Sequence, residues 1–167
     1  MERTAEKLNR TLERLISLYE ELLACSRDKT QCLVACDVEG IENMQAREAL
    51  VVGKLSDMER VREGVLSEAA ETLGCTVKPP TISALILTLP DSFEGRGRLV
   101  ELRDRLKTLG RDIAAANRLN EQLCTQSLTH LEVFMGLLTG RSGRSAVYTA
   151  QGKARLYEAR ALLTRSA

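Results

Sequence analysis

Few side chains in this sequence could carry out chemistry. Cys32 and Cys36 lie one helical turn apart, a spacing that would suit a soft-metal or redox site. However, no histidine lies near them, and neither cysteine is expected at the N-terminus of a helix, where a thiol becomes reactive. We therefore interpret these two cysteines, together with Cys25 and Cys124, as small apolar packing residues.

The chain has one histidine, His130. As a general base it would need a nucleophile and an orienting acid, and Glu132 is the one local candidate. A metal-binding helical bundle would need Glu-x-x-His repeats, but Ser127 stands three residues before His130. The glycines around 95–97 form no phosphate-binding loop. We therefore predict no catalytic residue, no metal site, no cofactor and no enzymatic activity.

The composition also argues against an enzyme. The chain has 167 residues, a formal net charge of +1, two Phe, three Tyr and no Trp. Ligand pockets and platforms that stack on single-stranded nucleic acid both depend on aromatic side chains. Apolar runs such as residues 83–89 are too short to cross a membrane, no secretory signal is visible, and the cysteines are odd in number. We expect a cytoplasmic protein that binds no nucleic acid and inserts in no membrane.

Apolar residues that recur at alternating intervals of three and four predict three long helices, at 3–36, 38–73 and 98–139. A short helix is predicted at 82–89. Long helices joined by short connections must lie side by side. The predicted fold class is therefore all-α: an elongated antiparallel bundle of three long helices, a short helix between the second and third, and a flexible amphipathic C-terminal tail.

Individual residues set the helix ends. Asp37 and Thr81 are predicted N-caps, and Gly74 is predicted to end a helix in the left-handed conformation. The last long helix has the clearest apolar seam: Leu99, Leu102, Leu106, Leu109, Ile113, Ala116, Asn120 and Leu123, extended by Leu128, Leu131, Phe134 or Met135, and Leu138.

Asn120 is polar at a seam position, where a buried amide fixes the register of packed helices. We favour this structural role for Asn117 and Asn120 over direct contact with a partner.

The chain changes character at Gly140. Residues 141–167 contain six basic residues and one acidic residue, whereas the preceding part is mildly acidic. We therefore divide the chain into a helical bundle, 1–140, and a linker with an amphipathic partner-binding tail, 141–167. The apolar residues of this tail would suit a helix that enters a partner's groove: Leu156, Tyr157, Leu162 and Leu163.

Four motifs follow one another along the chain: Leu15, Tyr19 and Leu22-Leu23 before Asp37-Val-Glu-Gly-Ile; Thr72-Leu-Gly; Asn117-Arg-Leu-Asn120-Glu-Gln-Leu123; and Val147-Tyr148-Thr-Ala-Gln-Gly152. In this order and spacing they resemble the FlgN family of bacterial flagellar export chaperones.

The resemblance implies a cytoplasmic chaperone that binds hook–filament junction (hook-associated) proteins. Such a chaperone prevents their premature assembly and delivers them to the type III export apparatus of the flagellum. It also implies that the C-terminal region binds the substrate, through Tyr148, Gly152 and the amphipathic stretch described above. Asn117, Asn120 and Leu123 belong to the family motif of the third long helix.

One alternative is a structural coiled-coil or adaptor protein whose partner surface lies on the bundle. Self-association through the tail or the bundle also stays open.

Overall fold

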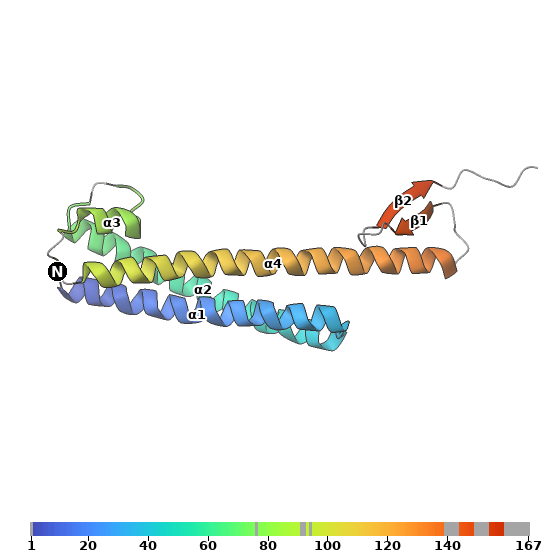
Figure 1. The fold of residues 1–167 in the computed structure, drawn as a ribbon. Helices are drawn as coiled ribbons and strands as arrows, with labels where there is room; N and C mark the ends of the chain where they lie inside the picture. The colour runs from blue at the N-terminus through green and yellow to red at the C-terminus, as the bar shows by residue number, and fades with distance from the viewer. Residues whose placement is uncertain are drawn as a thin grey trace, which may run out of the picture. The chain divides into compact units, whose positions relative to one another are not determined.

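The computed structural model describes residues 2–75, 77–90, 93, 95–138, 144–148 and 154–158. They form the helices α1 (Glu2–Ala35), α2 (Val38–Thr72), α3 (Ile82–Thr88) and α4 (Arg96–Leu138), and the strands β1 (Arg144–Tyr148) and β2 (Ala154–Glu158) (Figure 1). The all-α fold class is confirmed, and each helix end lies within two residues of its predicted position. Two compact units, 1–120 and 121–167, make up the chain. The predicted domain boundary at 140 lies outside the described residues.

In the first unit, α1, α2 and the first half of α4 lie side by side, with α3 at one end (Figure 1). Contacts between the helices establish their directions. Lys7 Nζ lies 2.6 Å from Glu68 Oε2, and Lys29 pairs with Glu48, so α2 runs antiparallel to α1. On the other side of α1, Glu13 and Glu20 pair with α4 residues in ascending order, at 2.8 Å to Arg98 and 2.6 Å to Arg105. The bundle therefore runs up, down and up.

The core of this unit is aliphatic. The leucines of α1 at positions 8, 12 and 15 are fully buried, and they contact a cluster contributed by all four helices. No Pro or Gly interrupts the sequence up to residue 36, so α1 remains regular over its whole length. Burial of this continuous apolar face is the main source of stability for helices of such length.

The connection between α1 and α2 is a single tight turn. Cys36 adopts a left-handed φ of 54°, and the Asp37 N–H donates to Cys32 O at 2.9 Å. Asp37 then caps α2, because its carboxylate accepts the Gly40 N–H at 3.0 Å. This predicted cap is confirmed, and one residue both closes the first helix and opens the second.

The end of α2 repeats this arrangement with a glycine. Gly74 has a φ of +65°, and the Cys75 N–H donates to Ala70 O at 2.9 Å. Thr81 caps α3 by accepting the Ala84 N–H at 3.1 Å. Both predictions are confirmed. Among the described residues, no helix is long and apolar enough to span a membrane.

The second unit contains the end of α4 and a two-stranded antiparallel sheet. β1 and β2 pair with Arg144 opposite Glu158 and Tyr148 opposite Ala154. The apolar residues of the tail predict a helix that includes Leu156 and Tyr157, so the strand at 154–158 differs from the prediction. Each of the two short segments contains a tyrosine, the first also contains the β-branched Val147, and the five residues between them include Gly152, a pattern typical of a hairpin.

Candidate partner-binding surface

The last turns of α4 expose large apolar side chains. Leu128 is 62% exposed, Leu131 and Phe134 are each 57% exposed, and Leu138 is 67% exposed. Their spacing of three or four residues places them on one side of the helix. We call these four residues the α4 apolar face. Single exposed apolar residues are ordinary, but a contiguous apolar stripe marks an interaction site.

The prediction that these residues continue the buried seam of the bundle is therefore wrong. The seam is buried or half-buried from Leu99 to Leu123, and it is exposed from Leu128 onward. α1 ends at Ala35, soon after Thr30, which bonds to Asn120, whereas α4 continues to Leu138. The periodicity of α4 continues without change across this point, so it does not reveal where the apolar residues become exposed.

The same turns carry little charge. Between residues 121 and 138 there is no Lys or Arg, and the acidic residues are Glu121 and Glu132. A helix face intended for water normally carries charged residues opposite its apolar stripe. The scarcity of charge supports the interpretation that this part of α4 is a surface to which another protein binds.

A polar cluster marks the end of the buried seam. Asn120 is 4% exposed, and its Nδ2 donates to Ser26 O at 2.9 Å. The Thr30 hydroxyl donates to Asn120 Oδ1 at 2.6 Å. One turn earlier, the Ser26 hydroxyl donates to Asn117 Oδ1 at 3.0 Å. Sliding α4 along α1 would separate these groups and leave a buried amide without partners, which is costly. This arrangement supports the predicted register role of Asn120.

The residues predicted to bind a partner through the tail fall partly within the described chain. Tyr148 is the last residue of β1, and Leu156 and Tyr157 lie in β2 opposite Ala146 and Ser145. Gly152, Leu162 and Leu163 lie outside the described residues. The structure therefore places three of the six on one hairpin.

The cysteines differ from their predicted role. Cys25 is 1% exposed and packs in the core as expected, and Cys32 is half-buried. Cys36 and Cys124 are exposed, so their interpretation as packing residues is wrong. Within the described part of the chain, no group of three or more His, Cys, Asp or Glu residues could hold a metal ion.

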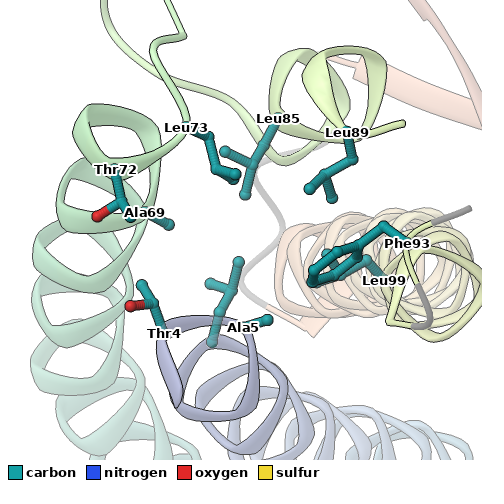
Figure 2. Close-up of a pocket in the computed structure, with 10 residues that line it drawn as sticks. Thr4, Ala5, Ala69, Thr72, Leu73, Leu85, Leu89, Phe93 and Leu99 are labelled. Carbon is teal, nitrogen blue, oxygen red and sulfur yellow. The ribbon is translucent and has the colours of Figure 1, made fainter. Parts of the chain in front are cut away.

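A small cavity lies where α3 meets the three long helices. Figure 2 shows Leu73, Leu85 and Leu89 pointing into this space, with Phe93 and Leu99 closing one side. Its volume is about 20 Å³, little more than the roughly 10–15 Å³ that one water molecule requires. The lining is apolar, so we interpret the cavity as a packing void and not as a ligand site.

Among the described residues, every ionisable group whose pKa is shifted lies in the first unit. Burial raises the pKa of Tyr19, and the charge of Glu59, which accepts the Tyr19 O–H at 3.0 Å, raises it further. Hydrogen bonding to Arg103 lowers the pKa of Asp104. The causes are burial, ion pairs and hydrogen bonds between helix residues, and no shifted group belongs to the α4 apolar face.

The comparison with protein families agrees with the motifs. The model of the FlgN protein family matches residues 1–155, from the start of α1 into β2. Neither a curated protein nor a solved structure matches the sequence. Because the family match includes the bundle, the whole of α4 and the first strand of the tail, this chain belongs to the FlgN family.

Proposed function

We propose that this protein is a cytoplasmic chaperone of flagellar type III export that binds hook–filament junction proteins, prevents their premature assembly and delivers them to the export apparatus. Membership of the FlgN family supports a role as a flagellar export chaperone in general. The α4 apolar face is the observation that carries the more specific proposal, because it provides a protein-binding surface. The proposed activity is binding, and we assign no catalytic residue.

The spacing of the α4 apolar face defines the kind of client segment it accepts. Leu128, Leu131 and Phe134 are separated by three residues each, and Leu138 follows four residues later. A second amphipathic helix packs against such a stripe by placing its own apolar side chains between these. A client helix covered in this way is unavailable for assembly with other subunits.

In this proposal the tail forms the second part of the client site. Tyr148, Leu156 and Tyr157 bring aromatic and aliphatic groups to the hairpin, and Gly152, Leu162 and Leu163 belong to the same segment of sequence. A tail that becomes ordered on the client loses conformational entropy, which lowers the affinity. Moderate affinity suits a chaperone that must release its client for export.

The α4 apolar face is tested by the double variant Leu131→Ser/Phe134→Ser as bait in a lysate of cells that express flagellar proteins. We expect recovery of hook–filament junction proteins, quantified by mass spectrometry, to fall at least about tenfold, as for central residues of an interface. The matched control is Leu50→Ser/Val52→Ser, which alters two exposed apolar residues of α2, 68% and 49% exposed. It should recover the same proteins as the unaltered chain.

Truncation after residue 140 tests the contribution of the tail. We expect the truncated protein to lose its clients while its helicity and melting temperature stay nearly unchanged. Equal recovery by the truncated and full-length proteins would contradict a client site in the tail. If the α4 variant also retained its clients, the partner surface would lie on the bundle, as in the alternative of a structural adaptor protein.

A further inference from the structure

A second surface of the bundle lies between α2 and α4. This hollow, which we call the α2–α4 groove, has a volume of about 640 Å³ and is closed on one side by the segment Pro79–Ser83. The residues that matter for its chemistry are Arg62, Leu66, Ile82, Arg103, Leu106 and Lys107. All of them belong to the first unit, and none is part of the α4 apolar face or of the tail.

The floor of the groove is apolar. Leu66 is buried at 1% exposure, and Ile82 and Leu106 are half-buried beside it. On α3, Ser83 lines the groove and Leu87 follows four residues later on the same face. Leu87 is 82% exposed, the highest value among the large apolar residues of the described chain. An apolar floor therefore continues from the groove onto α3.

The rim of the groove is mainly positive. Arg62, Arg103 and Lys107 line it, against one acidic residue, Glu63. Arg62 is held by Glu59 at 2.5 Å and Arg103 by Asp104 at 2.8 Å, and each guanidinium keeps further N–H groups for another acceptor.

Lys107 has no ion pair within the described residues. The nearest carboxylate on its own helix, Asp104, feels the charge of Lys107 but is already hydrogen-bonded to Arg103 through both of its oxygens. The Lys107 ammonium group can therefore pair with a carboxylate of a partner.

We propose that the α2–α4 groove binds an amphipathic helix of a partner protein that carries acidic residues beside its apolar face. Its apolar side chains pack on Leu66, Ile82 and Leu106, and its carboxylates meet Arg103 and Lys107. A protein segment fits better than a small organic ligand, because the lining contains no aromatic residue. The proposal does not depend on the proposed function, because it uses different residues.

The probe is a fluorescent synthetic helix of about 18 residues, or about five turns. Leucines at intervals of three and four form its apolar face, and glutamates flank them. A twin peptide has lysine in place of every glutamate. Fluorescence anisotropy with the full-length protein should give an affinity for the glutamate peptide about tenfold higher than for the lysine twin, since the charges of rim and peptide are complementary.

Charge reversal locates the binding site. Arg103→Glu/Lys107→Glu should weaken binding of the glutamate peptide about tenfold and strengthen binding of the lysine twin. The matched control, Arg14→Glu/Lys54→Glu, makes the same change of net charge at exposed residues outside the groove and should leave both affinities within about twofold. Leu87→Ser, at an exposed position, should lower the affinity for the glutamate peptide several-fold. Circular dichroism verifies that each variant keeps its helices.

Three results would overturn the proposal. One is failure of the unaltered protein to bind the glutamate peptide. Another is an equal loss of affinity in the two double variants, which would assign the binding to net charge or to the basic tail. The third is unchanged affinity in Arg103→Glu/Lys107→Glu. None of these results bears on client binding by the α4 apolar face, so the two proposals fail separately.

Discussion

The two halves of α4 have the same spacing of apolar residues but different surroundings. In the first half, Leu99 and Leu109 are 1% and 4% exposed, packed against the other helices of the bundle. In the second half, Leu131 and Leu138 are 57% and 67% exposed. Periodicity therefore determines which face of a helix is apolar, whereas burial of that face depends on whether a neighbouring segment covers it.

The charged residues of the two halves differ as well. Up to Asn120, α4 carries many cations, and Arg98 and Arg105 pair with acidic residues of α1. After Asn120 there is no Lys or Arg at all. The first half combines a buried seam with a charged outer surface, as a bundle helix should. The second half has the apolar seam but lacks the charged outer surface. This combination is typical of a segment that binds another molecule.

The largest expected effect is a difference in stability between these halves. Leu99→Ala should lower the free energy of unfolding by about 2–5 kcal/mol, because it removes a buried side chain and leaves a cavity. Leu131→Ala should change it by less than about 0.5 kcal/mol, because its side chain is already exposed to water. Urea unfolding followed by circular dichroism measures both. A comparable loss in the two variants would mean that the α4 apolar face is covered in the isolated protein.

A smaller effect is expected at the polar cluster between the halves. Asn120→Ala removes two hydrogen bonds at a buried site and should cost about 1–3 kcal/mol of unfolding free energy. The control is Gln122→Ala, two residues later and exposed, which should change the free energy of unfolding by about 0.5 kcal/mol or less. The same urea titrations compare the two variants. Equal costs would contradict the assignment of Asn120 as the residue that holds α1 and α4 in register.

The smallest effect concerns the turn that joins α1 to α2. Cys36 has a left-handed backbone, which costs a residue with a side chain about 1–2 kcal/mol. Cys36→Gly should therefore raise the free energy of unfolding by about 0.5–1 kcal/mol, since the greater freedom of glycine in the unfolded chain offsets part of the gain.

Cys36→Ala is the control for this turn, because it removes the thiol but keeps the Cβ, and it should have little effect. A gain in Cys36→Ala equal to that in Cys36→Gly would assign the effect to the thiol. Client recovery should be unchanged in both variants, because the change concerns the bundle and leaves the α4 apolar face intact.

The local features of this fold were predictable because each depends on residues close together in sequence. Asp37 and Thr81 cap helices with their own side chains, and Gly74 ends one with its own backbone. The same holds for the apolar seam up to Asn120, where an unbroken pattern indicates a long buried face. The hairpin of the tail was missed because an amphipathic stretch as short as 154–158 suits a strand as well as a helix.

By itself the sequence determined the four helices, their ends, the buried position of Asn120 and the resemblance to the FlgN family, which the family match confirms. Only the tertiary structure decided which apolar residues are covered. Segments far apart in sequence determine the exposure of Leu131, the hydrogen bond between Ser26 and Asn117, and the groove between α2 and α4. The spacing of residues along one helix contains no information about where its neighbours end.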